Sequence, residues 1–265
     1  MVIDNFFIHH QTPSQYVYWG ENYVDVYRAA DADKTFTKIL SVDNLSISAI
    51  TPYQFQDIAK ELLKTDTGII LNSGQFIFNI FEFEKLPFQE KLKRELVEWR
   101  LKKVFPENIE EYEHNFYKLN KNRVLSLLFK KSLKENIENL FRENGISLTY
   151  LGNSTVEMMN HVGKLKKETP DFFIEIDKNL SIAVFLERNL PFYIRKFRSD
   201  QAADIVNEVV KTINFLKNSY TTVPRTFSLV VRRSDADIHL VRDELSKMEI
   251  LPLELKNNEQ FIFPI

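Results

Sequence analysis

The sequence predicts an α/β fold of two lobes built from one duplicated unit, with a small α+β subdomain inserted in the first lobe. Residues 16–29 and 171–197 both begin with short runs rich in Val, Ile, Tyr and Phe, separated by Asn-containing turns, which is typical of antiparallel strands. After each stretch, helical patterns alternate with further apolar runs. Aligning the two turns places residues 17–20 (VYWG) on residues 174–177 (IEID), which indicates a weak internal repeat.

The composition excludes several classes of protein. The 265 residues have a formal net charge of -2, so no overall attraction to nucleic acid is expected. Cysteine is absent, which excludes disulfides and thiolate sites. No apolar run approaches the roughly 20 residues that span a bilayer, and a cytoplasmic protein is expected. Glycine occurs only six times, and neither GxGxxG nor GxxxxGK[ST] is present.

The first lobe begins with residues 1–14, which we expect to be a loose leader. His9 and His10 are adjacent there, and adjacent side chains are poorly placed to bind one metal, so solvent exposure is favoured. A hairpin over 16–29 and a strand within 35–50 follow. Thr51 as N-cap and Pro52 at the first position predict a helix that ends near Lys64.

The predicted insertion begins with two alternating strands over 68–72 and 75–84. Glu82 and Glu84 share one face at the strand end, where solvent exposure is favoured over a catalytic pair. Residues 88–105 predict an amphipathic helix whose apolar stripe contains Leu92, Leu96, Trp99 and Val104. Its basic residues alternate with Glu90, Glu95 and Glu98, which favours a solvated face over nucleic-acid binding.

The remaining elements follow in regular alternation. We expect strands around the turn at 120–122, a helix that ends at Gly145, a strand over 147–151 and a helix that reaches His161, a structural histidine. Residues 164–170 are a charged linker ending in proline. We expect the last elements to be the three strands of 171–197, a helix over 200–218, a strand over 226–232, a helix over 238–248 and a strand over 251–255.

Two acids in the first strand of the second lobe are the candidate for chemistry. Glu175 and Asp177 are two residues apart, so they point to the same face at the mouth of a hairpin. Two carboxylates there suit a metal site, or the remains of one.

The middle of the chain contains the most informative motifs for a family comparison. They are Leu86-Pro87, then LVEWRLKKVFP at 96–106 and NRVLSLLFKKSLKENIENLFRENGISLTYLGNST at 122–155. In the order and spacing of these motifs the chain resembles the cytoplasmic parts of the pilus-assembly protein PilM and the type II secretion protein GspL, over about residues 16–255. These proteins have a duplicated actin-like (ribonuclease-H-like) fold.

The resemblance implies a division into domains. Residues 1–66 and 121–163 would form the first actin-like lobe, residues 67–120 the inserted α+β subdomain, and residues 164–265 the second lobe. The helix that ends near Asn218 is followed almost at once by the next strand. The second lobe therefore lacks the helical insertion that forms part of the adenine pocket in PilM-like proteins.

The nucleotide motifs of that family are altered in this chain. Each family hairpin has an apolar residue, Asp, an apolar residue and Gly, where Asp engages the metal and Gly lets amides reach phosphate. Tyr18 and Glu175 stand at the two Asp positions, and Gly20 and Asp177 at the two Gly positions. Asp177 would meet phosphate as a like charge, an unfavourable interaction of roughly 4 kcal/mol at an effective dielectric near 20. Where the family resemblance leads us to expect a glycine-rich loop for adenine, this chain has residues 232–235 (RRSD).

The sequence therefore predicts a pseudo-ATPase without catalytic residues, bound metal or cofactor. The vestigial nucleotide-site positions are Tyr18, Gly20, Glu21, Asn22, Glu175, Asp177 and Asn179.

Three functions remain open at this point. The first is a non-catalytic assembly module of a type IV pilus or type II secretion platform, held at the inner membrane through partners. Its partners would be a short cytoplasmic peptide of a membrane protein and the motor ATPase, and self-association stays open. The second is an actin-like ATPase that still binds Mg-ATP through Glu175 and Asp177. The third is a two-metal nuclease that uses Asp25, Glu175 and Asp177, although Asp25 belongs to the other lobe.

Overall fold

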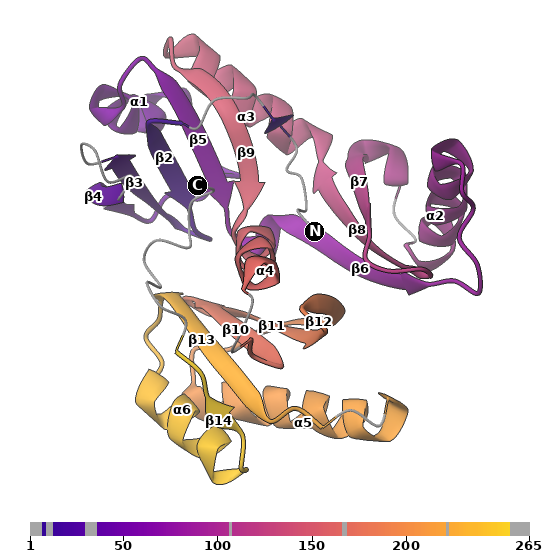
Figure 1. Cartoon of the computed structure of the whole chain (residues 1–265). Coiled ribbons are helices and arrows are strands. Elements are labelled where there is room, and N and C mark those ends of the chain that lie inside the picture. Colours follow the sequence, from indigo (N-terminus) through magenta and orange to yellow (C-terminus); the bar gives the residue numbers. More distant parts are fainter. Residues whose placement is uncertain are drawn as a thin grey trace. The chain divides into compact units, whose positions relative to one another are not determined.

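The structure is a computed structural model that describes residues 7–8, 13–29, 36–105, 108–165, 169–220 and 223–254. The described residues form two compact units, one up to Met158 and one from Met159 onward (Figure 1). The second unit starts at Met159, and the start of the second lobe at position 164 stays a prediction.

The first unit is built on a six-stranded sheet with the order β1-β9-β5-β2-β3-β4. Strands β2, β3 and β4 are antiparallel neighbours, β5 is parallel to β2, and β9 is parallel to β5. The strands are β1 (Phe7–Ile8), β2 (Gln15–Trp19), β3 (Tyr23–Ala29), β4 (Phe36–Asp43), β5 (Asp66–Leu71) and β9 (Ser147–Asn153). Residues 1–14 were expected to be a loose leader, but within them Phe7–Ile8 form strand β1, which pairs with β9.

Helices α1 (Pro52–Glu61) and α3 (Lys131–Glu143) pack on one face of this sheet. Trp19 stacks on Phe55 of α1 at a centroid distance of 6.2 Å, and Phe55 contacts Phe141 of α3 at 5.1 Å. Thr51 caps α1, as its sequence predicted, and also forms a capping box with Gln54. Gly145 ends α3 with a positive φ of 68°, a conformation that glycine adopts without strain.

The insertion is a three-stranded sheet with the order β6-β8-β7, covered by helix α2. Its elements are η1 (Ser73–Gln75), β6 (Phe76–Glu82), α2 (Glu90–Val104), η2 (Ile109–Glu111), β7 (Tyr112–Lys118) and β8 (Arg123–Lys130).

The strand pairing corrects the predicted insertion boundaries of 67–120. Strand β5 pairs with β2 and β9, so residues 67–71 belong to the first-lobe sheet. Strand β8 pairs with β6 and β7, so residues 123–130 belong to the insertion. The boundaries shift because β5 and β6 follow each other in the sequence with similar alternation but pair with different distant strands.

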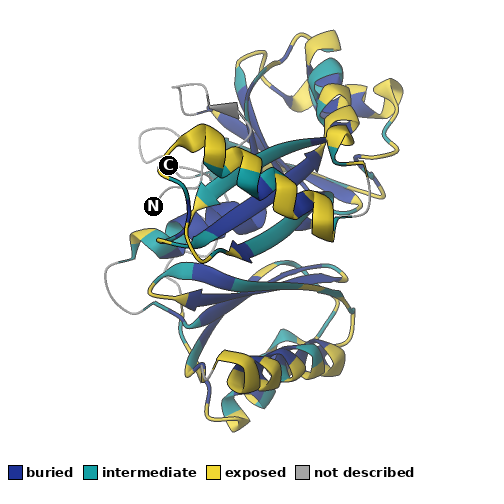
Figure 2. Cartoon of the chain, turned by 90° about the vertical axis from the view of Figure 1, so that its right-hand side faces the viewer, coloured by how far each residue is buried: buried dark blue, intermediate teal, exposed yellow. Residues whose placement is uncertain are grey.

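The apolar stripe that the sequence predicted for α2 is also partly wrong. Val97 and Leu101 are the buried residues of this helix, and Leu96 packs partly against the same core. Leu92, Trp99 and Val104 are exposed instead. Figure 2 shows exposed residues along the outward side of α2.

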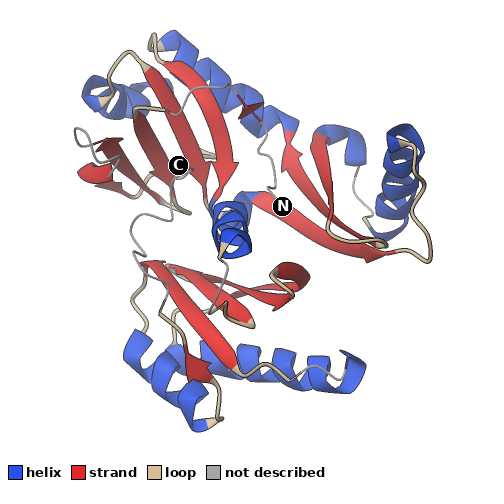
Figure 3. Ribbon diagram, in the orientation of Figure 1, coloured by secondary structure: helices blue, strands red, loops and turns tan. Residues whose placement is uncertain are grey.

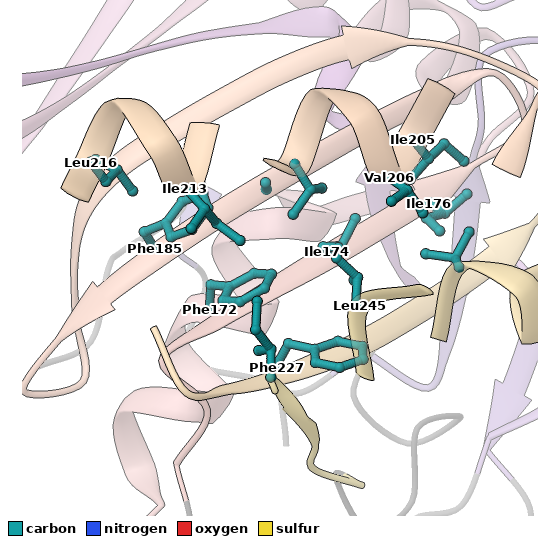
Figure 4. Packing of buried hydrophobic residues seen from close by; sticks show 14 of the residues in the cluster. Phe172, Ile174, Ile176, Phe185, Ile205, Val206, Ile213, Leu216, Phe227 and Leu245 are labelled. Atoms are coloured by element: carbon teal, nitrogen blue, oxygen red, sulfur yellow. The ribbon is translucent and has the colours of Figure 1, made fainter. Parts of the chain in front are cut away.

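The second unit is built on a five-stranded sheet with the order β12-β11-β10-β13-β14. Its elements are β10 (Phe172–Asp177), β11 (Leu180–Glu187), β12 (Leu190–Arg198), α5 (Ala202–Tyr220), β13 (Thr226–Arg233), α6 (Ile238–Lys247) and β14 (Leu251–Pro252). Helix α4 (Ser154–Lys164) precedes them. Both α5 and α6 lie on one side of the sheet (Figure 3) and bury Phe172, Ile174 and Ile176 (Figure 4).

The two sheets repeat one topology, which confirms the predicted duplication. In each, three antiparallel strands are followed by two strands parallel to the first, so β4-β3-β2-β5-β9 corresponds to β12-β11-β10-β13-β14. The turns also match. The Gly20 amide donates to the Tyr23 carbonyl across a two-residue turn, and Asp177 pairs with Leu180 across another. Tyr18 therefore corresponds to Glu175, and Gly20 to Asp177.

Candidate functional site

The candidate site consists of the two hairpin turns and the strand ends beside them. In an actin-like plan, as in other α/β sheets, ligands bind at the carboxyl ends of the parallel strands. The turns are 20–23 in the first unit and 177–180 in the second. We describe each turn within its own unit.

The second-unit hairpin contains a buried ion pair that the sequence did not predict. Arg232 Nε lies 3.2 Å from Glu175 Oε1, and the two side chains are only 2% and 4% exposed. The strands that hold them, β13 and β10, are parallel neighbours in the sheet. The carboxylate that the sequence comparison placed at a metal position is thus matched by a guanidinium of this chain. A buried carboxylate is tolerated when it is paired in this way.

The turn next to this pair is held by contacts within the chain. The Lys178 amide donates to the Arg233 carbonyl at 2.5 Å, and the Ser199 amide donates to the Asn179 carbonyl at 2.8 Å. Arg198 Nη1 donates to Asn179 Oδ1 at 3.3 Å. Asp177 is 3% exposed. A turn amide of the type that would bind phosphate is already used by a protein carbonyl.

Tyr18 occupies the corresponding metal position of the first unit with a packed aromatic ring. It is buried and belongs to a cluster with Tyr16, Tyr23 and Ile70. Its ring centroid lies 5.9 Å from that of Tyr23. A phenol in this position supplies no carboxylate to a hard cation such as Mg²⁺, which binds mainly carboxylate, phosphate and water oxygens.

Side-chain packing explains why position 20 holds a glycine. A Cβ at this position would lie 2.1 Å from Cε1 of the Tyr23 ring, which is fully buried. In the same turn, the Leu45 amide donates to the Asn22 carbonyl at 2.9 Å. Glu21 is partly exposed and Asn22 is exposed. The close approach that needs glycine is therefore made by a tyrosine of the same hairpin.

Asp25, the third carboxylate of the nuclease hypothesis, has contacts of its own in the first unit. Ser41 Oγ donates to it at 2.6 Å, and Lys38 Nζ lies at 3.5 Å. Glu175 and Asp177 lie in the second unit. In the described part of the chain, three or more His, Cys, Asp or Glu side chains do not gather at any point in a way that could hold a metal ion.

Other residues named from the sequence have ordinary surroundings. Glu82 and Glu84 are exposed at the end of β6, and Glu82 lies 3.5 Å from Arg123 Nε. His161 is half-buried in α4, where burial, and secondarily Lys164, lower its pKa to about 4. His9 and His10 lie outside the described residues.

A buried polar network in the first unit was missed by sequence reasoning. Ser73, at the start of the insertion, lies 2.6 Å from Thr155 Oγ1, and Asn153 Nδ2 donates to Ser73 Oγ at 3.0 Å. Tyr150 donates to Glu157, and burial together with that carboxylate raises the pKa of Tyr150. The signal in the sequence was a run of four polar residues, 153–155 and 157, at a strand-to-helix junction.

Each turn, taken within its own unit, differs from the metal- and phosphate-binding pattern to which the sequence was compared. The first-unit position holds a tyrosine ring, the second-unit carboxylate is paired with Arg232, and Asp177 stands where phosphate requires a close backbone amide.

Solved structures with similar folds cover nearly the whole chain. The PilM–PilN type IV pilus biogenesis complex aligns with a TM-score of 0.69 and 13% identity, over 94% of this chain and 90% of that chain. A Bacteroides thetaiotaomicron protein described as having an actin-like ATPase fold and unknown function aligns with a TM-score of 0.61 and 13% identity, over 93% of each chain. The chain has an actin-like fold.

A third similar structure comes from a secretion system. It is the cytoplasmic domain of EpsL, an inner-membrane component of the type II secretion system of Vibrio cholerae. It aligns with a TM-score of 0.59 and 8% identity, over 94% of this chain and 92% of that chain. The predicted resemblance to PilM and GspL is thereby confirmed for the actin-like fold.

Comparisons of sequence add no further relatives. The chain is matched by no protein-family model and by no curated protein. In the part of the chain that the structure describes, no helix combines the length and apolar character needed to span a membrane.

Proposed function

We propose that this actin-like protein is a non-catalytic assembly module of a type IV pilus or type II secretion platform. In this role it binds a short cytoplasmic segment of an inner-membrane partner and contacts the motor ATPase. The proposal draws on fold likeness to the PilM–PilN complex and to the EpsL cytoplasmic domain, which extends over 94% of the chain in each case.

The main support for a non-catalytic role is the buried ion pair of Arg232 and Glu175. A metal ion that approached Glu175 would have to displace a guanidinium that is 2% exposed. Truncating one partner of such a pair leaves an uncompensated buried charge and costs about 3–5 kcal/mol. Metal binding therefore competes with a contact that stabilises the second lobe.

The first-lobe turn supports the same proposal independently. Tyr18 is packed against Tyr23, and the space beside Gly20 is filled by the Tyr23 ring. Neither position offers an oxygen ligand of the type found in a magnesium site.

Calorimetry with Mg-ATP tests the non-catalytic part. We expect no saturable heat and no rise in the melting temperature with Mg-ATP, because both metal-side positions are occupied by the chain itself. An ATPase of the same fold, measured under identical conditions, is the positive control. Micromolar binding of Mg-ATP would contradict the proposal and favour the remodelled ATPase.

A pull-down tests the assembly part. Synthetic peptides from the cytoplasmic N-termini of neighbouring inner-membrane pilus or secretion proteins are immobilised, with scrambled peptides of the same composition as controls. We expect one native peptide to retain the full chain while its scrambled version does not. Failure of every such peptide, and of the motor ATPase, to bind would count against this role.

A further inference from the structure

Helix α2 has apolar residues on both of its sides. Its inner side packs Val97 and Leu101 into the core of the insertion. Its outer side presents Leu92 and Trp99, which are 45% and 52% exposed, and Phe88, which is 96% exposed, lies two residues before the helix begins at Glu90. Leu92 and Trp99 are seven residues apart and therefore lie on one side of the helix. We call Phe88, Leu92 and Trp99 the outer stripe.

The outer stripe has no role in the core of the insertion, since that core is complete without it. Exposed single apolar residues are common on proteins, but here two share one side of a helix and a third, Phe88, closely precedes that helix. Substitutions in the stripe should consequently leave the fold intact.

Exposed cations flank the outer stripe. Helix α2 contains six basic and three acidic residues, a net charge of +3 in a chain whose formal net charge is -2. Four exposed bases, Lys91, Arg100, Lys102 and Lys103, lie beside the stripe, together with one exposed acid, Glu95, which is three residues after Leu92 and four before Trp99. Among the residues that the structure describes, none of these four forms an ion pair with a carboxylate. Lys103 Nζ instead lies 3.7 Å from the centroid of the Trp99 ring.

We propose that the outer face of α2 adsorbs to an anionic lipid surface. Aromatic and aliphatic side chains on the outer side of a helix, with basic residues beside them, are the pattern of helices that lie in the membrane interface. Lysine stems cover apolar surface while their ammonium groups reach lipid phosphates. The charge complementarity favours anionic lipid over neutral lipid. The helix lies on the membrane and does not span it.

Vesicle co-sedimentation of the full chain tests this surface. We expect binding to phosphatidylcholine vesicles that contain phosphatidylglycerol, weakening in high salt, and little binding to phosphatidylcholine alone. Lys102→Gln with Lys103→Gln should lower the partition coefficient about 25-fold, since each lysine contributes about fivefold near such a surface. Phe88→Ser with Trp99→Gln should lower it at unchanged charge.

Matched controls are available at α1. Lys60→Gln with Lys64→Gln removes the same charge, and Tyr53→Ser removes an aromatic residue that is 78% exposed. These variants should bind vesicles like the unaltered chain. Lack of binding to anionic vesicles by the unaltered chain, or equal losses in the α1 and α2 variants, would overturn the proposal.

Tryptophan fluorescence gives a second readout. The chain has two tryptophans, and Trp19 is fully buried while Trp99 is half-exposed. Anionic vesicles should shift the emission to shorter wavelength in the unaltered chain, and Trp99→Phe should abolish that shift. A chain that shows the shift but binds no partner peptide would retain this inference and lose the proposed function.

Discussion

Arg232 and Glu175 illustrate, at the residue scale, how one contact changes what a hairpin can bind. They are separated by 57 positions in the sequence and meet because β10 and β13 are parallel neighbours. The sequence showed the acid at the family's metal position and an arginine near the end of an apolar strand. It did not show how β10 and β13 are aligned, and this alignment brings the two charges together.

Substitution of this pair gives a first prediction. Arg232→Met should destabilise the protein by about 3–5 kcal/mol, because Glu175 would remain buried and uncompensated. Glu175→Leu with Arg232→Met should recover most of that loss. Urea denaturation of the single and double variants measures the coupling. Additive losses would contradict a direct interaction between the two side chains.

Gly20 leads to a second prediction about close packing. Gly20→Ala places a methyl group 2.1 Å from the buried Tyr23 ring, so it should destabilise the protein by about 1–3 kcal/mol. In a Tyr23→Ala background the same change should cost less than about 0.5 kcal/mol, since the obstructing ring is absent. Chemical denaturation of the four proteins provides the test. An equal loss in both backgrounds would show that glycine is needed for another reason.

At the element scale, most strands and helices were predictable from local patterns. The turn at 178–179, the Thr51 cap and the Gly145 stop each depend on residues adjacent in the sequence. The predictions were wrong where the structure depends on contacts with residues distant in the sequence. Strand β5 pairs with β2 and β9, and its partners could not be inferred from its own alternation. The apolar residues of α2 are split between two sides, and periodicity assumes that they all point inward.

The insertion also leads to a prediction about pH. His114 on β7 is partly buried, its Nε2 lies 3.2 Å from Ser126 Oγ, and burial, with Arg94 as a second cause, lowers its pKa from 6.5 to about 4. The unfolded chain therefore binds more protons than the folded chain between these values. The stability that neutral His114 contributes is complete above about pH 6.5 and declines as the pH falls toward about 4.

His114→Gln tests this dependence because Gln can keep the hydrogen bond to Ser126 without titrating. The loss of unfolding free energy between pH 7 and pH 5 should be smaller in this variant than in the unaltered chain. His239→Gln, at an exposed position of α6, is the matched control. An identical loss in His114→Gln and the unaltered chain would contradict the assigned pKa shift.

At the scale of the whole molecule, the duplicated topology is what the sequence could support best. The alignment of VYWG with IEID was weak, yet the turns and strand orders of the two units agree with it. The divergence of the two copies has a physical pattern. The first turn is filled by aromatic packing, whereas the second is held by an ion pair and backbone hydrogen bonds.

The second lobe should fold without the first. Its five-stranded sheet and helices α5 and α6 share a continuous core that includes Phe172, Ile205 and Phe227, all fully buried. Such a core is expected of a domain that folds independently. A fragment of residues 164–258 should therefore show near-ultraviolet circular dichroism and one cooperative urea transition, and the fragment bearing Ile205→Ala should unfold at lower urea concentration. A gradual transition in the unaltered fragment would mean that the first lobe is required to complete this core.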